Sequence, residues 1–413
     1  MNALLRSRFP ELARWIEAAP EPGRVEWLPG PRRALAIDGV QLASRYDPRA
    51  EAELQARLVP PGARRATLYG FAQGEIVRVL LARRELEHLR VVPLDPSVAR
   101  AVFARCDPAD WLGDPRVELV SPVECRELAP PFAASPADLC LAGDEAARLR
   151  DLVVLELATP FLRRQRGTSA AGVASHGEEN ERRFRHDGGI SELGGTRPGA
   201  TLCVAAAGPT LARHYEELRA RRRELIAVDA ALKPLLAAGV APEFVVTQDG
   251  HEEGMRRLFD VPAAGLEACT LVYFPATPPE VLARWPGMRR AVRGDPGQEP
   301  ALFGSGSVVH PAVDLAVRLG ARRIELFGAD FATPGGQSHV AGSGWQFRYE
   351  QGGWTRWVLD GHGRRVPSLP NLIGYLRDLE RYIARHPEVA WINRSRDGAT
   401  ILGTRVEEGL HVA

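Results

Sequence analysis

Residues that could bind a phosphate group gather in the second half of the chain, at the ends of apolar runs of strand length. The run 200–207 is followed by Gly208, Pro209 and Thr210. Glycine lets a ligand approach the backbone, proline suits the first turn of a helix, and the free N–H groups of a helix start attract phosphate. This turn predicts a phosphate site, although an ordinary strand-to-helix turn can have the same sequence.

Further polar residues follow the next strand patterns. Asp229 and Asp249 each end an apolar run, and Lys233, the only lysine of the chain, lies one helical turn beyond Asp229. The stretch Ser305-Gly306-Ser307 precedes a helical pattern and offers a helix cap and a second anion cradle. Asp330 comes shortly after another strand pattern. These residues are the candidate binding groups.

The elements that must position these residues alternate between strand and helix patterns. Such alternation predicts an α/β fold with a mostly parallel, Rossmann-like sheet. The carboxyl ends of parallel strands meet at one edge, which is where ligands bind in open α/β sheets. We therefore expect the candidate residues to share that edge.

The same segments resemble a known family. The strings AGPTL from 207 and VDAALKPLLAAGVAPEFVVTQD from 228 resemble the MptE-like domain, which motility accessory factors share with archaeal 6-hydroxymethylpterin diphosphokinases. Residues 66–121 and 366–403 are similar to the family's flanking parts, so the resemblance extends over most of the chain. Thr210 stands where the family usually has serine, which keeps the hydroxyl group, and the Gly250-His251 pair departs from the commonest form.

A second similarity concerns the family 42 sialyltransferases. They share a glycine-proline-serine turn, a serine-glycine loop before a helix, a strand ending in Gly-x-Asp-Phe, and a loop histidine that acts as a base. By this similarity His339 is the candidate catalytic base, because an imidazole pKa lies near working pH. A histidine on a flexible surface loop is the alternative. The resemblance implies a sialyltransferase-like domain without a metal or other cofactor.

Together the resemblances imply transfer of a nonulosonic, sialic-acid-like sugar from a CMP donor to a hydroxyl group, with flagellin Ser or Thr as an acceptor. One alternative is ATP-dependent pyrophosphoryl transfer to 6-hydroxymethylpterin, in which Asp229, Asp249 and Asp330 would hold Mg²⁺ on the phosphates. Another is a non-enzymatic role as a flagellar assembly or binding factor.

Composition shifts predict five parts. Gly70 and Gly74 mark a glycine turn between strand and helix patterns, and Asp95 stands at the ribose position of a nucleotide-binding fold, but the turn lacks the full glycine set. We interpret this part as a degenerate methyltransferase-like domain, a scaffold without cofactor. The predicted parts are a leader with short strands (1–62), this degenerate domain (63–141), a connector helix and flexible linker (142–199), the transferase core (200–345) and a C-terminal α/β segment (346–413).

Composition narrows the function classes. The 413 residues are 45% hydrophobic and 25% charged, with a net charge of +1, which gives no electrostatic case for nucleic acid. The five cysteines lack the spacing of a zinc site or a disulfide framework. No apolar run reaches the roughly 18 residues of a membrane span, and the N-terminus lacks a signal-peptide pattern. We expect a cytoplasmic protein.

Overall fold

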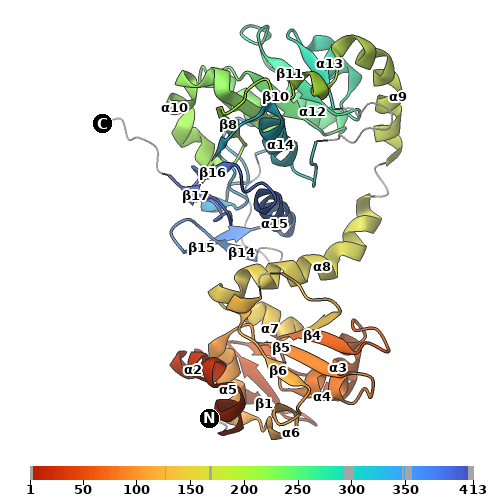
Figure 1. The fold of residues 1–413 in the computed structure, drawn as a ribbon, viewed down its shortest axis with the longest axis vertical. Helices are drawn as coiled ribbons and strands as arrows, with labels where there is room; N and C mark the ends of the chain where they lie inside the picture. Colours follow the sequence, from red (N-terminus) through yellow and green to blue (C-terminus); the bar gives the residue numbers. More distant parts are fainter. Residues whose placement is uncertain are drawn as a thin grey trace. The chain divides into compact units, whose positions relative to one another are not determined.

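The computed structural model describes residues 3–125, 127–166, 170–292, 302–346, 348 and 356–407, and gives side chains for these except at 159–166, 170–175 and 185. The chain divides into two compact units, Met1–Thr159 and Pro160–Ala413 (Figure 1). Each unit is built on a parallel sheet flanked by helices. The protein is therefore an α/β protein with Rossmann-like architecture.

The sheet of the first unit has the strand order β6-β5-β4-β7, and all its neighbouring strands are parallel. The apolar strand patterns alternate with helix patterns here, as a parallel sheet requires. The strands are β4 (Arg65–Tyr69), β5 (His88–Val92), β6 (Val117–Leu119) and β7 (Phe132–Ala134). The helices are α3 (Pro48–Ala56), α4 (Glu75–Leu81), α5 (Pro96–Arg105), α6 (Ala109–Leu112), α7 (Pro136–Leu141) and α8 (Ala147–Arg166), which extends past Thr159.

Residues 1–62 do not form a separate leader. They fold into α1 (Ala3–Arg8), α2 (Pro10–Ala18) and an antiparallel sheet of β1 (Val25–Leu28), β2 (Ala34–Ile37) and β3 (Val40–Gln41). Leu5, Ile16 and Leu35 are fully buried, and they belong to the same hydrophobic cluster as Leu68 and Val91 of the parallel sheet. The N-terminal segment and the nucleotide-type fold therefore share one core.

The glycine turn of the first unit is closed by the chain's own carboxylate. The backbone N–H groups of Phe71 and Ala72 donate to Asp138 of α7, at 3.2 and 2.9 Å. Gly70 has a φ of +74°, and a Cβ there would lie 2.2 Å from the Cβ of Asp138. Asp95 accepts a hydrogen bond at the start of α5 as its N-cap. The N–H groups of this turn and the carboxylate of Asp95 thus take part in hydrogen bonds within the protein.

The second unit contains an eight-stranded sheet in the order β12-β11-β10-β9-β8-β13-β16-β17, with every neighbouring pair parallel. From β8 the chain adds strands on one side as far as β12, and then crosses to β13 on the other side of β8. The strand order thus reverses between β8 and β13. The strands are β8 (Thr201–Ala205), β9 (Leu225–Val228), β10 (Phe244–Thr247), β11 (Thr270–Tyr273), β12 (Arg289–Ala291), β13 (Arg323–Phe327), β16 (Ala390–Asn393) and β17 (Arg405–Val406).

Helices connect these strands, as the sequence pattern predicts (Figure 1). The connection between β12 and β13 contains α14 (Val309–Leu319), an amphipathic helix that ends at Gly320 in the left-handed conformation with φ +102°. The other connecting helices are α10 (Tyr215–Ala220), α11 (Asp229–Ala237), α12 (Glu252–Leu258) and α13 (Pro279–Arg284).

The predicted flexible linker is wrong for most of its length, because residues 170–187 form helix α9 (Ala170–Asp187). The buried Asn180 donates to two carbonyl groups of the 275–277 turn, and Asp187 forms hydrogen bonds of 3.0 Å with Arg289 at the sheet edge. The segment is poor in apolar residues, and polar anchors replace hydrophobic ones. Residues 167–169 of the predicted linker lie outside the described residues.

The C-terminal segment is part of the second unit. Strands β14 (Arg356–Leu359) and β15 (Arg365–Ser368) form an antiparallel hairpin, followed by α15 (Pro370–Ala384). β16 pairs with β13, and β17 extends the same sheet. The predicted separation of residues 200–345 from 346–413 therefore does not correspond to two folding units.

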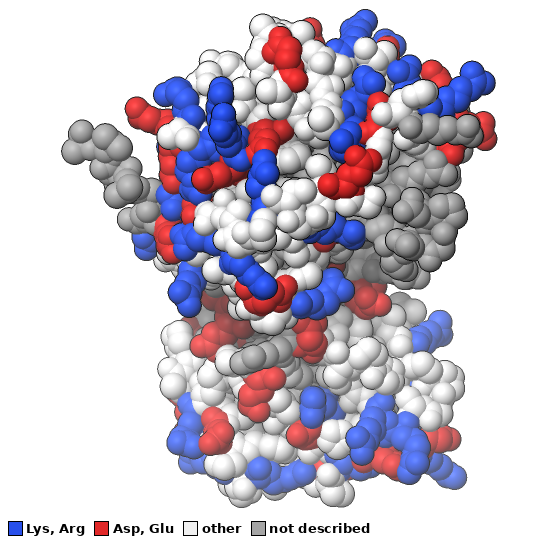
Figure 2. Space-filling model, turned by 45° about the horizontal axis from the view of Figure 1, so that its top comes forward, with Lys and Arg blue, Asp and Glu red and all other residues white. Residues whose placement is uncertain are grey.

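Two surface properties bear on function. In the part of the chain that the structure describes, no helix has the length and apolar character needed to cross a membrane. Figure 2 shows positive and negative side chains interspersed on the face in view, in agreement with the net charge of +1. This face lacks the continuous basic tract that nucleic-acid binding uses.

Candidate active site

A crevice lies at the carboxyl ends of the strands where the strand order reverses. Its cavity volume is 290 Å³, and its walls come from the segments that follow β8, β9, β10 and β13 and from the start of α14 and α15. In open α/β sheets this position is the usual ligand site. Of the predicted residues, Gly208, Asp229, Asp249, Gly306, Ser307, Asp330 and His339 line it.

The turn after β8 has a structural role that the sequence did not predict. The N–H of Gly208 donates to the carbonyl group of Gly328 at 2.8 Å, the N–H of Thr210 donates to Asp330 at 2.9 Å, and Pro209 has no N–H. The helix that starts here, Pro209–His214, is a short 3₁₀-helix. The donors expected to bind phosphate are therefore occupied within the protein.

Packing alone requires a glycine at position 208. A Cβ at this position would lie 2.4 Å from the carbonyl oxygen of Gly328 and 2.5 Å from Oδ2 of Asp330. Such distances are far shorter than van der Waals contact. The loops after β8 and β13 approach each other too closely for any side chain between them.

Asp330 lines the crevice, but its carboxylate is hydrogen-bonded to other residues of the protein. Its carboxylate accepts from the N–H and, at 2.5 Å, from the hydroxyl group of Thr210, and the Thr210 hydroxyl group also lies 3.0 Å from that of Ser395. Burial raises the pKa of Asp330, and the hydrogen bonds from Thr210 oppose that effect. The side chain joins the loops after β8, β13 and β16, and thereby fixes the shape of the crevice.

Asp229 is a second buried carboxyl group in the crevice. It is 3% exposed and accepts hydrogen bonds from Thr247 at 2.8 Å and from the N–H of Ala230 at 2.7 Å. Burial raises the pKa of Asp229 to about 7, the two hydrogen bonds lower it by less, and nearby Asp249 raises it further. Such a group can exchange a proton near neutral pH, which is typical of functional sites.

Of the two other charged residues predicted for the site, Asp249 and Lys233, only Asp249 reaches the crevice. Asp249 is exposed at the crevice, whereas Lys233 does not line it and lies 3.7 Å from Asp260 on the surface. Since Asp330 is bonded elsewhere, the predicted three-carboxylate magnesium site is not formed. The described residues include no group of three or more His, Cys, Asp or Glu side chains that could hold a metal ion.

The start of α14 supplies the hydrogen-bond donors that the β8 turn lacks. Gly306 has a φ of +87°, which a glycine adopts without strain, and no described residue accepts from the N–H groups of Gly306, Ser307 and Val308. Ser305 instead bonds Asp378 of α15 and does not line the crevice. The glycine-serine loop therefore keeps the geometry of an anion site, with Ser305 as its support.

His339 lies on the loop after β13 and faces the crevice. Its Nδ1 is 3.0 Å from the hydroxyl oxygen of Ser338, and no described residue bonds its Nε2. Burial lowers the pKa of His339 below 6.5, so the ring is neutral at physiological pH. A neutral imidazole with a free nitrogen in a crevice can act as a base.

Further crevice residues come from elements that sequence reasoning assigned no role. Asn371, Leu372 and Tyr375 of α15 line the crevice, and the Tyr375 carbonyl group accepts from buried His310. Only the similarity of residues 366–403 to the C-terminal part of the family pointed to this segment. Trp345 also lines the crevice. It begins the aromatic-rich stretch 345–357, whose sequence suits either a cover over a sugar or acceptor site or two β-hairpin strands, and of which residues 347 and 349–355 lie outside the described residues. No lysine or arginine is among the described lining residues.

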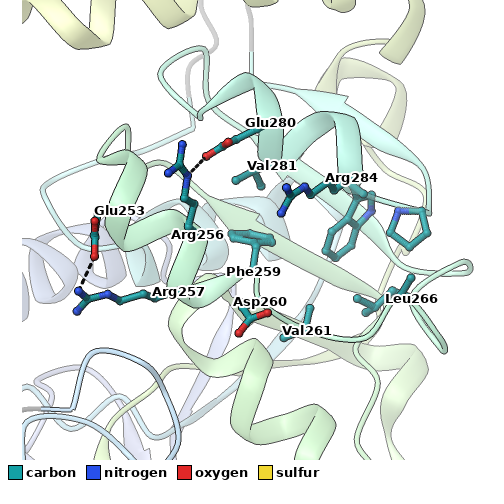
Figure 3. Close-up of a pocket in the computed structure, with 13 residues that line it drawn as sticks. Glu253, Arg256, Arg257, Phe259, Asp260, Val261, Leu266, Glu280, Val281 and Arg284 are labelled. Atoms are coloured by element: carbon teal, nitrogen blue, oxygen red, sulfur yellow. Dashed lines mark hydrogen bonds and ion pairs between the residues drawn. The ribbon is translucent and has the colours of Figure 1, made fainter.

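A larger cavity of 770 Å³ is lined by residues of α12, of α13 and of the segments that follow each of these helices (Figure 3). Its rim charges largely neutralise each other: Arg256 bonds Glu280 at 2.5 Å, and Arg257 bonds Glu253 at 2.6 Å. None of the predicted site residues lines it. The smaller crevice is therefore the candidate active site.

Comparisons with known proteins found one family match and similar solved structures. Residues 179–336 match the family model described as 6-hydroxymethylpterin diphosphokinase MptE-like, and no curated protein matches the chain. A structure of the MAf glycosyltransferase from Magnetospirillum magneticum AMB-1 is 15% identical with a TM-score of 0.42, and covers 99% of this chain and 74% of that chain. A spermidine synthase structure is 17% identical with a TM-score of 0.26, and covers 32% of this chain and 51% of that chain. Residues 179–336 of this protein, which include the crevice side chains from Gly208 to Asp330, are an MptE-like domain.

Proposed function

We propose that this protein is a transferase that moves a nonulosonic, sialic-acid-like sugar from a CMP donor to a hydroxyl group, with flagellin Ser or Thr as the acceptor. The observation that carries the proposal is the neutral, half-buried His339 in a crevice that the start of α14 also lines. The sequence similarity of the same motifs to sialyltransferases supports the choice of donor.

Each crevice group has a role in this reaction. The N–H groups of Gly306, Ser307 and Val308 would hold the donor phosphate, since no basic side chain is among the described lining residues. Asp229 follows the strand next to β8, where an acidic residue bonds the ribose in Rossmann-type sites.

His339 would act on the acceptor. Its Nε2 takes the hydroxyl proton while the acceptor oxygen forms a bond to the anomeric carbon of the sugar. The bond between that carbon and the phosphate oxygen breaks, and CMP leaves with the electron pair. No metal ion is needed in this scheme, because the proton goes to imidazole and the phosphate charge stays on CMP.

A second candidate is pyrophosphoryl transfer from ATP to 6-hydroxymethylpterin. It is favoured by the family description and by the pairing of Asp229 and Asp249 in a crevice without lysine or arginine among its described lining residues. Mg²⁺ is commonly held by one or two carboxylates together with substrate phosphates. Asp330 would have no direct part, because Thr210 and Ser395 form hydrogen bonds with its carboxylate.

Calorimetry with CMP, CDP and ATP, each with and without Mg²⁺, separates the two candidates. We expect CMP to bind without metal. Binding of ATP that requires Mg²⁺, together with no binding of CMP, would contradict the sugar-transfer proposal and favour the pterin reaction. If the protein binds neither CMP nor ATP, the result would favour the alternative of a non-enzymatic role as a flagellar assembly factor.

The variant His339→Ala tests the role of the base. We expect transfer to fall on the order of a hundredfold to ten-thousandfold while CMP affinity stays within about threefold, since the base contacts the acceptor proton and not CMP. The activity of the unsubstituted protein should rise with pH along a limb centred below 6.5, because burial lowers the pKa of His339. His186→Ala, on the exposed surface of α9, is the matched control. A fully active His339→Ala would move the role of base to Asp229.

A further inference from the structure

The loop that carries His339 is fixed on both sides of the histidine. The N–H of Val340 donates to the carbonyl group of Ala207 at 2.8 Å, which ties the loop to the end of β8. Ser343 is fully buried and its hydroxyl oxygen accepts from the N–H of Trp345 at 3.3 Å. The backbone of His339 is thus held in place, and only the orientation and protonation of its ring remain to be set.

Ser338 is the described partner of that ring. Its hydroxyl oxygen lies 3.0 Å from Nδ1 of His339 and 3.5 Å from the carbonyl oxygen of Trp345. A carbonyl oxygen can only accept, whereas a hydroxyl group can donate one hydrogen bond and accept others. When the Ser338 hydroxyl group donates its hydrogen to the Trp345 carbonyl oxygen, its oxygen can only accept from His339, so the proton of the ring lies on Nδ1.

Trp345 is itself immobilised against the wall of the crevice. Its indole ring packs on α12 so closely that a Cβ at Gly254 would lie 2.3 Å from the indole Cζ2 atom. The acceptor that orients the Ser338 hydroxyl group therefore stands at a defined place, and the direction of the hydrogen bonds runs from His339 through Ser338 to Trp345.

We propose that Ser338 is a positioning residue that holds His339 in the tautomer with the proton on Nδ1, so that Nε2 carries the free electron pair toward the crevice. The partner of one ring nitrogen commonly decides which nitrogen is basic. Its relevance to catalysis rests on the proposed transferase function, but the tautomer itself is a property of the protein alone.

Nuclear magnetic resonance of the full chain with ¹⁵N-labelled histidine tests the tautomer without any substrate. The His339 signals are identified by their loss in His339→Asn. We expect the Nδ1–H form in the unsubstituted protein, and a shift toward the Nε2–H form, which free imidazole side chains prefer in water, in Ser338→Ala. Ser338→Thr keeps a hydroxyl group and should keep the Nδ1–H form.

Activity provides the second readout. Ser338→Ala should lower kcat on the order of tenfold, the usual effect of removing a hydrogen-bond partner that orients a functional histidine, with unchanged CMP affinity and recovery in Ser338→Thr. An Nε2–H tautomer in the unsubstituted protein, or no change in Ser338→Ala, would overturn the positioning role. A correct tautomer in a protein that binds no CMP would leave the role of Ser338 standing and refute the proposed function instead.

Discussion

Replacing Asp229 by Asn should stabilise the second unit at alkaline pH, and the size of the effect follows from its surroundings. Burial raises the pKa of this carboxyl group from 3.8 to about 7. A carboxyl group whose pKa is raised by folding does not reduce the free energy of unfolding below pH 3.8, where the folded and unfolded states are both protonated. The free energy of unfolding falls as the pH rises from 3.8 to about 7, and the loss is constant above pH 7. Relative to an unperturbed carboxyl group, Asp229 therefore costs about 2 kcal/mol of folding free energy at pH 5, where the folded protein keeps it protonated, and about 4 kcal/mol at pH 8, where it is ionised.

Asparagine has nearly the same shape and no charge. Its oxygen can still accept from the N–H of Ala230, and its amide group can donate to the hydroxyl oxygen of Thr247, in place of the bonds that Asp229 makes. The expected result is a variant that is more stable than the unsubstituted protein at pH 8 by about 2 to 4 kcal/mol, with a smaller gain at pH 5.

Urea unfolding of the full chain at pH 5 and pH 8 measures this difference, and hydrogen exchange of the β10 peptide assigns the transition to the second unit. Asp260→Asn is the matched control, because that aspartate lies in the same unit with its side chain 85% exposed, and it should change stability equally at both pH values. A variant at Asp229 with the same pH dependence as the unsubstituted protein would refute the reasoning that burial holds a destabilising carboxylate in the crevice.

Three other substitutions test individual features of the fold. Gly208→Ala should destabilise the second unit by about 1 to 3 kcal/mol in thermal or urea unfolding, because its Cβ would meet Gly328 and Asp330; unchanged stability would show that the loops can separate. Asp187→Ala should cost about 2 kcal/mol and speed hydrogen exchange in α9, since it leaves Arg289 without its partner; equally slow exchange in α9 would mean that other contacts hold the helix. Asp138→Ala should destabilise the first unit by about 1 to 3 kcal/mol by leaving two buried N–H groups unpaired, and a neutral effect in urea unfolding would argue that water replaces the carboxylate.

Part of this architecture can be predicted from the sequence alone. The alternation of apolar runs and amphipathic stretches locates β8 to β10 and α14, because local periodicity reflects which face of an element is buried. The position of polar residues after successive strands also predicts that Asp229 and Asp249 meet at one edge, since parallel strands end together. Both inferences need only local sequence and the rule that ligands bind at strand carboxyl ends.

The direction in which each side chain points was decided by tertiary contacts. Thr210, Asp330 and Ser395 come from segments up to 185 residues apart, and their mutual hydrogen bonds cannot be read from any one segment. For the same reason the sequence could not reveal that Gly208 is required by packing against the loop after β13.

The role of two polar segments also depended on distant partners. The apolar content of α9 is too low to predict an ordered helix, and its order comes from the contacts of Asn180 and Asp187 with residues about 100 positions away. Similarly, Tyr375 reaches the crevice only because α15 packs beside α14. The sequence by itself determined the elements with regular apolar periodicity, such as β8 to β10 and α14, and the polar groups that end at the ligand edge, because these follow from local pattern. Only the tertiary structure decided which of those groups are free to bind a ligand, because a hydrogen bond made elsewhere in the fold removes a donor or acceptor from the site.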